Sequence, residues 1–344
     1  MAKYLIVGGA GFIGVNAAEH YLQTGHTVTL IDNLSRQGTE ENLKWIQTEY
    51  PSVRFVRADI RVDQAVLDAE AAKCDVLLHL AAQVAVTTSV VDPRTDFEIN
   101  ALGTLNVLEA ARHAPQPPIV LYTSTNKVYG GMEDVPVIRE GNRYAYQNLP
   151  EGVSEEQPLD FHSPYGCSKG AADQYVRDYS RIYGLQTVVL RQSCIYGTHQ
   201  FGNEDQGWIA WFLRCALLGK PVTIFGDGRQ VRDVLYVSDL IAAYDASIEN
   251  IGRSSGRVYN IGGGPDNTLS LLETVDLLEK ATDSKLHHSF SDWRPGDQRI
   301  FVSGVGRARR ELGWRPTVSP KEGIAQMRAW MAANLEAVGQ TFHL

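Results

Sequence analysis

The chain of 344 residues has few cysteines and no long apolar run. Its four cysteines, Cys74, Cys167, Cys194 and Cys215, are widely spaced and form no C-x-x-C pair, which argues against a disulfide framework and a structural zinc site. No run reaches the roughly 18 apolar residues of a spanning helix, and residues 4–7 are too short for the core of a signal peptide. We therefore expect no membrane span, no export and a cytoplasmic location.

The chain also lacks an excess of positive charge. It has 32 basic and 40 acidic side chains, a net charge of −8, so no global field attracts nucleic acid or an anionic membrane surface. An anionic ligand must instead be held by local arginines or helix N-termini. Hydrophobic residues make up 44% and charged residues 21%, which excludes a disordered scaffold. Without internal repeats, heptads or low-complexity tracts, a solenoid or filament is also excluded.

Short apolar runs alternate with stretches of helical spacing through the first half of the chain. This alternation predicts parallel strands joined by crossover helices, a doubly wound α/β sheet. The strands are expected at residues 4–7, 27–31, 53–56, 76–80, 119–123 and 187–190. Long helices are expected at 96–112 and 163–183, and a polar, proline-containing surface loop at 130–161. After residue 195 the alternation becomes irregular, which predicts a smaller second domain.

A glycine-rich segment, residues 8–14, lies between the first strand and the first helix. In that position glycines let a pyrophosphate approach backbone N–H groups at the helix N-terminus, although their spacing differs from G-x-G-x-x-G and a tight turn is the alternative. Asp32 ends the second strand, where a carboxylate can bind both adenosine ribose hydroxyls and repel a 2′-phosphate. NAD is therefore favoured over NADP, with Arg36 keeping NADP open. Asp59 and Ile60 would touch the adenine, unless Asp59 only caps a helix.

Tyr165 and Lys169 are four residues apart, on one face of a helix that begins after Ser163 and Pro164. A phenol is a weak base at neutral pH, but a neighbouring ammonium and an oxidised nicotinamide would favour the phenolate. Tyr165 could then take a hydroxyl proton while a hydride leaves the same carbon. A tyrosine and a lysine at this spacing, without another motif, are most often exposed neighbours on a surface helix. A catalytic role is indicated only because the glycine-rich nucleotide-binding segment is also present.

With these motifs in order, the chain resembles the extended short-chain dehydrogenase/reductase family over almost its whole length. The motifs are residues 8–14, Leu80-Ala81-Ala82-Gln83, Asn100, Thr123-Ser124-Thr125, Val128-Tyr129-Gly130, Tyr165 with Lys169, Arg232-Asp233, and residues 294–297. The resemblance implies a Rossmann-type NAD-binding domain with a smaller mixed α/β domain that grips a nucleotide sugar. The expected division is 1–190 with a returning segment at about 232–258, against 191–231 and 259–344.

The resemblance also assigns roles to individual residues. It implies Tyr165, Lys169 and Thr125 as the catalytic residues. It implies a cofactor site made of Gly8, Gly11, Phe12, Ile13, Gly14, Asp32, Asn33, Asp59, Ile60, Leu80, Ala81, Ala82, Gln83, Asn100 and Ser124, with Tyr165 and Lys169. It implies a substrate site made of Gln83, Thr125, Asn126, Arg232, Arg294 and Asp297, in which the two arginines hold a diphosphate. Without this frame, the arginines and their aspartates would be ordinary surface ion pairs.

The two residues that follow Thr125, Asn126 and Lys127, indicate which reaction is catalysed. Family members that dehydrate or decarboxylate their substrate have carboxylates there, and Asn126 and Lys127 cannot replace them. Segments 83–88, 123–130, 160–175 and 205–208 are similar to a subgroup that inverts C2 of a CDP-linked hexose through a 2-keto sugar. A 4-epimerase or reductase of the same family and a non-catalytic NAD-binding module remain alternatives. The choice of cytosine as the nucleotide base rests on the resemblance alone.

The sequence shows no cluster with the spacing of metal ligands. His79 and His162 are isolated, and a single histidine beside a strand or helix start is more often a structural donor, so we expect no metal. Residues 96–112 and 163–183 resemble the helices through which family members pair. We therefore expect a homodimer or homotetramer, with a CDP-sugar as substrate and no nucleic-acid partner.

Overall fold

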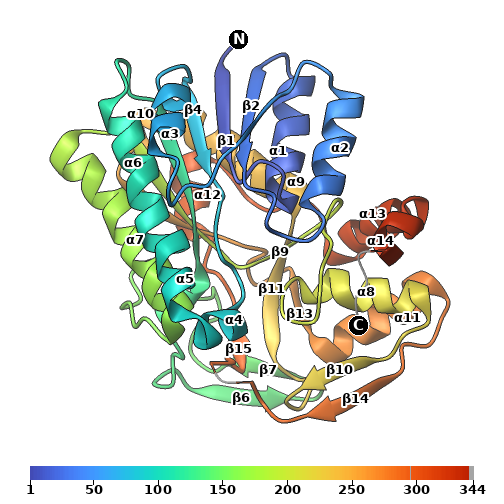
Figure 1. Cartoon of the computed structure of the whole chain (residues 1–344). Helices are drawn as coiled ribbons and strands as arrows, with labels where there is room; N and C mark the ends of the chain where they lie inside the picture. Colours follow the sequence, from blue (N-terminus) through green and yellow to red (C-terminus); the bar gives the residue numbers. More distant parts are fainter. Residues whose placement is uncertain (295, 341–344) are drawn as a thin grey trace.

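The computed structural model describes residues 1–294 and 296–340. Its centre is a seven-stranded sheet with the order β12-β8-β5-β4-β1-β2-β3, in which all neighbours are parallel (Figure 1). The strands are β1 (Lys3–Val7), β2 (Thr27–Asp32), β3 (Arg54–Arg57), β4 (Val76–His79), β5 (Ile119–Thr125), β8 (Thr187–Gln192) and β12 (Arg257–Ile261). The predicted doubly wound, Rossmann-type parallel sheet is confirmed.

Helices cover both faces of this sheet (Figure 1). One face carries α1 (Phe12–Gln23), α2 (Thr39–Glu49) and α9 (Val237–Glu249), and the other carries α3 (Gln64–Ala71), α6 (Gly103–His113) and α7 (Ser163–Tyr183). Successive strand residues point to opposite faces, so Ile6 and Leu30 join one hydrophobic core and Leu5 and Ile31 the other. Burial on both faces explains why these strands read as continuous apolar runs.

The helix expected at 96–112 differs from the prediction in being three segments. It consists of α5 (Pro93–Phe97), a π-helical turn η1 (Glu98–Leu102) and α6, with the short helix α4 (Val86–Val91) before it. Asn100 lies in this π-helical turn. The side-chain amide of Asn100 donates to the carbonyl oxygen of Gln83, in the loop after β4, at 3.1 Å. Such turns occur often at functional sites, and hydrophobic spacing alone does not reveal them.

The segment expected to be an irregular loop, 130–161, contains a hairpin. Its strands are β6 (Val137–Glu140) and β7 (Arg143–Tyr146), which pair antiparallel. Gly141 in the two-residue connection has φ of 56°, a conformation that favours glycine. The Gly141-Asn142 pair between two apolar-polar runs was a signal for this hairpin that the sequence analysis did not use.

The second half of the chain builds smaller sheets facing the carboxyl ends of the central strands (Figure 1). β11 (Val231–Tyr236) pairs with β9 (Cys194–Tyr196), β13 (Thr268–Ser270) and β15 (Ile300–Phe301), and β10 (Val222–Phe225) pairs with β14 (His288–Ser291). The helices here are α8 (Trp208–Leu218), α10 (Ile251–Ser254), α11 (Leu271–Thr282), α12 (Gly306–Leu312), α13 (Pro320–Ala333) and α14 (Leu335–Gln340). Capping boxes at Ser270 and Ser319 fix the starts of α11 and α13.

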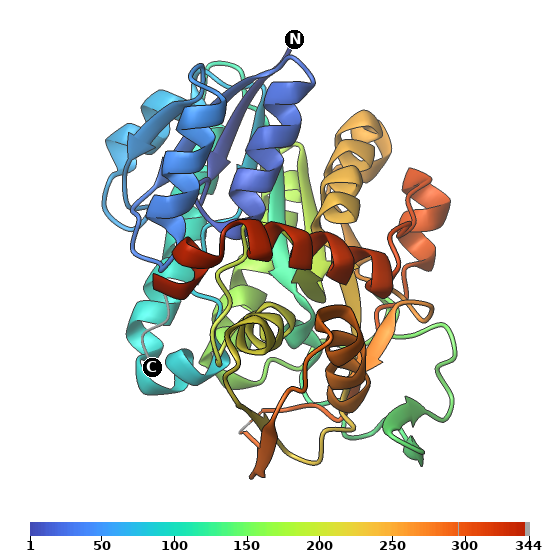
Figure 2. The same cartoon turned by 90° about the vertical axis from the view of Figure 1, so that its right-hand side faces the viewer.

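The chain returns to the central sheet through α9 and β12, whereas β11 belongs to the smaller sheet. The proposed division into two domains stays a prediction. Figure 2 shows α13 running across the boundary between the two sheet regions, beside the N-terminal helices. None of the helices in the described residues is long and apolar enough to cross a membrane.

Candidate active site

The glycine-rich turn between β1 and α1 is shaped by close backbone packing. Gly8 has φ of 86°, and a Cβ there would lie 2.5 Å from the amide nitrogen of Ala81; a Cβ on Gly14 would meet the carbonyl oxygen of Gly8. Gly11 differs, because its nearest neighbour would be that same oxygen at 3.3 Å. Gly11 is the N-cap of α1 and contributes no side chain there, so the backbone N–H groups that begin the helix stay open to an anion.

Asp32 ends β2 beside this turn. Its carboxylate accepts hydrogen bonds from the backbone N–H groups of Ala10, at 3.1 Å, and Leu34, at 2.8 Å. Burial raises the pKa of this carboxyl and the two hydrogen bonds oppose the rise. Arg36, which kept NADP open, donates to the Gln206 side-chain oxygen at 2.9 Å. Asp32 therefore faces a cavity edge where a ribose, but not a further phosphate, fits its charge.

A single cavity follows the carboxyl ends of β1, β2 and β4. Among the expected cofactor residues it is lined by Gly8, Gly11, Phe12, Ile13, Gly14, Asp32, Asn33, Asp59, Ile60, Leu80, Ala81 and Ala82. At its far end Asn33 donates to Asp59 at 3.0 Å, and the ion pair with Arg61 lowers the pKa of Asp59 to about 2. The open helix start, the carboxylate of Asp32 and the far end with Asp59 and Ile60 together fit an NAD-type dinucleotide.

The expected catalytic residues meet at the end of β5 and on α7, and none of them is among the residues that line the cavity. Thr125 closes β5, and Tyr165 and Lys169 lie one turn apart on α7; all three are buried. Tyr165 and Thr125 share a side-chain hydrogen bond. Lys169 donates to the carbonyl oxygen of Thr123 at 2.6 Å. The structure thus brings the phenol, the hydroxyl and the ammonium into one buried group.

Burial controls the protonation of this group. It raises the pKa of Tyr165 to about 12, against the hydrogen bond from Thr125, and lowers the pKa of Lys169 to about 7, against Asp173 and Asp96. The expected lowering of the phenol pKa by Lys169 is therefore corrected: the ammonium is turned to the Thr123 carbonyl, and desolvation of the phenol dominates.

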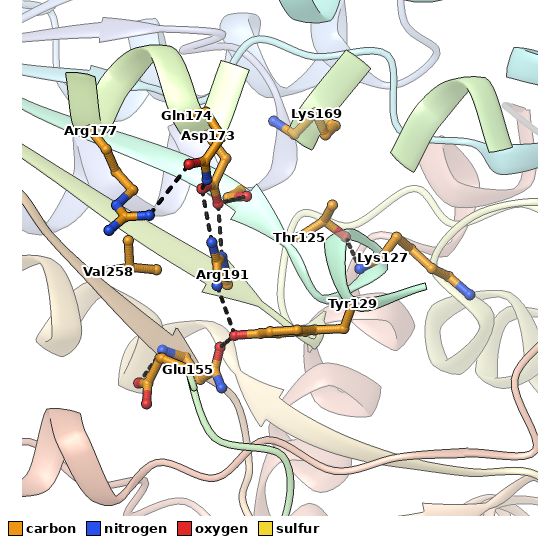
Figure 3. A network of polar contacts seen from close by, with 12 residues as sticks. Thr125, Lys127, Tyr129, Glu155, Lys169, Asp173, Gln174, Arg177, Arg191 and Val258 are labelled. Carbon is orange, nitrogen blue, oxygen red and sulfur yellow. Dashed lines mark hydrogen bonds and ion pairs between the residues drawn. The ribbon is translucent and has the colours of Figure 1, made fainter. Parts of the chain in front are cut away.

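Asp173 anchors the catalytic helix to the sheet (Figure 3). This carboxylate is fully buried one turn after Lys169, and Arg191 of β8 binds both of its oxygens at 2.9 and 3.0 Å. Arg191 also donates to the hydroxyl of Tyr129 at 3.0 Å, and Ser124 donates to Asp173 at 2.7 Å. The pair fixes α7, and with it Tyr165 and Lys169, against β5 and β8.

The remaining expected cofactor residues lie around the cavity without lining it. Asn100 binds the backbone of Gln83 in both directions, at 3.0 and 3.1 Å, and reaches the hydroxyl of Ser168 at 3.1 Å. The Gln83 side chain folds onto Ala85. Ser124 is bound to Asp173 as described. These side chains hold the loop after β4 against the catalytic helix.

The expected substrate residues come from β11 and the segment before β15. Arg232 donates to the carbonyl of Val231 at 2.8 Å, while Asp233 on the opposite side of the strand is fully buried and accepts from Ser193. The alternative of a surface Arg232–Asp233 ion pair is therefore wrong. Asn126, the other residue expected here, is buried and its side-chain oxygen lies 3.4 Å from the Thr125 hydroxyl.

Arg294 is held by the loop before α8. It contacts Asp205 at 3.1 Å, Glu204 at 3.9 Å, and stacks on the Phe225 ring with its guanidinium carbon 3.7 Å from the ring centre. Asp297 is exposed, and its backbone N–H binds the Arg294 carbonyl at 3.2 Å. A diphosphate at Arg294 must therefore displace or join the two carboxylates on that loop.

Lys127 was not among the expected site residues, yet it lies directly beside Thr125 (Figure 3). It lies on the 3₁₀ turn η2 (Asn126–Tyr129), where its N–H donates to the Thr125 hydroxyl oxygen at 3.2 Å. Its ammonium reaches the Gly296 carbonyl at 3.3 Å and the Gln298 side-chain oxygen at 3.5 Å. Its place two residues after Thr125 was the signal available in the sequence.

Within residues 1–294 and 296–340, no group of three or more histidine, cysteine and acidic side chains comes together in a way that could hold a metal ion. His79, at the end of β4, binds the Thr104 hydroxyl at 2.9 Å. His162 lies at the start of α7, 3.8 Å from Asp160.

Comparison with known proteins places this site in a family. The model of the NAD dependent epimerase/dehydratase family matches residues 4–262, so the chain belongs to that family. Membership confirms the family-level expectation and NAD as its cofactor. The cavity described above supplies the matching structural features.

Particular relatives are similar along nearly their whole length. The chain is 44% identical to CDP-paratose 2-epimerase of Salmonella typhi, covering 96% of this chain and 99% of the relative. It is 34% identical to UDP-glucose 4-epimerase of Mycolicibacterium smegmatis, covering 94% and 96%. The crystal structure of UDP-glucuronic acid 4-epimerase from Bacillus cereus, in complex with UDP-glucuronic acid and NAD, superposes with a TM-score of 0.83 at 28% identity, covering 96% and 99%.

Proposed function

We propose that this protein is an NAD-dependent epimerase that inverts C2 of a CDP-linked hexose, as in the conversion of CDP-paratose to CDP-tyvelose. The observation that carries the proposal is the buried Thr125–Tyr165–Lys169 group on β5 and α7, in a chain that also has the dinucleotide cavity, followed by Asn126 and Lys127 where a dehydrating site needs carboxylates. The 44% identity to CDP-paratose 2-epimerase supports the choice of carbon and base.

The chain binds the cofactor through backbone and one carboxylate. The first N–H groups of α1, exposed at Gly11, would hold the pyrophosphate, and Asp32 the adenosine ribose. Asp59 and Ile60 would border the adenine. When bound, NAD⁺ would supply a hydride acceptor for the sugar carbon, a hydride donor once it is reduced, and the positive charge of the nicotinamide ring.

Tyr165 would act as the acid-base residue at the C2 hydroxyl. It removes the hydroxyl proton as the carbonyl forms and returns it when the carbinol is restored. Thr125 would hold the same oxygen by a hydrogen bond, and Lys169, which donates to the Thr123 carbonyl, would hold the nicotinamide ribose. Because burial raises the pKa of Tyr165 to about 12, the phenol holds its proton in the free chain at neutral pH.

Inversion requires the keto sugar to present its opposite face to the same groups. Residues that hold the diphosphate firmly and the hexose loosely would allow that turn, and we assign the diphosphate to Arg232 and Arg294, as the family resemblance implies. Nothing further has to be broken in the sugar, which is consistent with Asn126 and Lys127 in place of carboxylates.

The test is a product assay on the purified protein with CDP-, UDP- and GDP-hexoses, read by proton NMR. We expect inversion at C2 of the CDP-hexose with no net change in nicotinamide absorbance. Tyr165→Phe should lower turnover by about 10³-fold or more while CDP-hexose affinity stays within about twofold. Stoichiometric consumption of NADH would identify a reductase, and inversion at C4 a 4-epimerase.

We also propose that the protein acts in the cytoplasm as a homodimer or homotetramer, and that its product serves lipopolysaccharide O-antigen synthesis. The exposed apolar side chains on the paired helices support assembly. They are Phe97, Leu102, Tyr175, Ile182 and Tyr183, on α5, η1 and α7.

A further inference from the structure

We propose that Lys127 binds the β-phosphate of the nucleotide sugar and so fixes C2, rather than C4, as the reacting carbon. The inference rests on the proposed function and deepens it. It assigns a specificity-determining role to a residue that follows the catalytic hydroxyl by two positions.

The position of Lys127 is set by its neighbours at both ends. Its backbone N–H is bound by the hydroxyl oxygen of Thr125, the residue that shares a hydrogen bond with Tyr165. Its ammonium lies at the carbonyl of Gly296 and the side-chain oxygen of Gln298. Lys127 therefore spans the gap between the acid-base residues and the segment expected to hold the diphosphate.

That segment is held in place independently of Lys127. The side-chain amide of Gln298 donates to the carbonyl oxygen of Gly130, one residue after η2. The backbone of Asp297 binds the carbonyl of Arg294 at 3.2 Å. The 296–298 segment is thus tied to the end of the catalytic turn, and the ammonium of Lys127 sits at the junction.

The ammonium of Lys127 has charged neighbours of both signs, Arg232 and Asp297. Its two hydrogen-bond partners are neutral oxygens, and Arg232 is close enough to disfavour the charged amine. Burial, then Arg232, lowers the pKa of Lys127 to about 8, while Asp297 and Cys194 act in the opposite direction. An anion between Lys127 and Arg232 would relieve the repulsion and use the remaining ammonium hydrogen.

The chemistry of the substrate places its β-phosphate at that point. The phosphate is joined through oxygen to C1, so C2 is the neighbouring atom and C4 lies across the ring. An enzyme that acts at C2 must hold the diphosphate beside its acid-base hydroxyls, whereas one that acts at C4 must hold it a ring's width away. The Lys127 side chain, whose backbone is bound to Thr125 and whose ammonium lies at the 296–298 segment, would supply the cation for the first arrangement.

The experiment compares CDP with CMP, which lacks the β-phosphate, on the NAD-loaded protein by calorimetry. Lys127→Met should weaken the binding of CDP by about tenfold or more and the binding of CMP by less than about threefold. Lys127→Arg should keep most of the wild-type CDP affinity. Lys127→Gln serves as a second neutral variant if Lys127→Met folds poorly. Lys44→Met, which removes an exposed charge from α2, is the matched control and should change neither affinity.

Equal losses for CDP and CMP, or no loss for either, would overturn the phosphate contact. An effect on CDP-hexose turnover alone, with CDP affinity intact, would move Lys127 to the sugar and also overturn it. If the wild-type protein binds CDP but converts no CDP-hexose, the proposed function fails while the CDP-to-CMP ratio still decides the role of Lys127.

Discussion

Single buried residues set the charge pattern of the site, and His79 shows this most simply. Its Nε2 lies 2.9 Å from the hydroxyl oxygen of Thr104, and that hydroxyl donates to the carbonyl of Asn100. The Thr104 oxygen must therefore accept from Nε2–H, which fixes one neutral tautomer. Burial, with Lys169 nearby, lowers the pKa of His79 to about 3.

This depressed pKa predicts an acid-sensitive stability. The unfolded chain takes up the proton below the ordinary pKa near 6.5, but the folded chain does so only near 3, so His79 lowers stability as pH falls between these values. Between pH 7.5 and 5, the free energy of unfolding should fall by about 2 kcal/mol more in the wild type than in His79→Gln. Urea titrations at the two pH values measure this difference, and parallel curves would contradict it.

Lys169 is the second residue whose charge depends on its surroundings. Burial lowers its pKa to about 7, and Asp173 and Asp96 oppose that shift. Asp173 is itself held by two hydrogen bonds from Arg191. The ion pair therefore acts on the catalytic lysine through position and charge, without contact to any ligand.

Among the helices and strands, α1 is the one whose first residues we expect to bind the cofactor directly. Gly11 has φ of −68° and ψ of 168°, values that alanine also adopts; it lines the cavity, and the nearest neighbour of an added Cβ would be the Gly8 carbonyl oxygen at 3.3 Å. We expect Gly11→Ala to weaken NAD binding by about tenfold or more, because the methyl group occupies the path of the pyrophosphate. The melting temperature should fall by about 2 °C at most.

Fluorescence titration with NAD and thermal melts measure both quantities. Gly252→Ala, on α10 with open space around it, is the control and should leave NAD affinity unchanged. Equal NAD affinity in Gly11→Ala and the wild type would show that the cofactor does not pass over this helix start.

Helices and strands with a strong hydrophobic period could be predicted from the sequence. Elements without such a period, the hairpin and the π-turn, could not be predicted in this way. The helix at 163–183 has the predicted ends, because Pro164 and Gly184 mark them. The hairpin at 137–146 and the π-turn at 98–102 were missed: one pairs exposed strands, and the other depends on Asn100 reaching Gln83. The hairpin had a local signal in Gly141-Asn142 that was not used, whereas a contact between separate elements accompanies the π-turn.

The candidate site divides in the same way. Residues that belong to local motifs, such as Gly11, Asp32 and Tyr165, could be named from the sequence. Lys127 could not, because its meaning comes from the 296–298 segment, about 170 positions later, which the fold brings to it. The pairing of Arg294 with Asp205 likewise appears only when the loop before α8 is in place.

At the scale of the whole molecule, the two sheet regions divide the work. The central sheet presents the dinucleotide cavity at the carboxyl ends of β1, β2 and β4, and the second half of the chain contributes Arg232 on β11, Arg294 and residues 296–298. The acid-base residues lie between them, on β5 and α7. A sugar bridging the two regions would place its ring where both faces can meet the same groups.

The most direct test of the account uses CDP-paratose labelled with deuterium at C2 in ordinary water, with the product read by NMR and mass spectrometry. If Thr125, Tyr165 and Lys169 act on a C2 hydroxyl in a closed site, the label should be retained at C2 of the inverted product in more than about nine molecules of ten. Loss of the label to solvent, or inversion at any other carbon, would contradict the account.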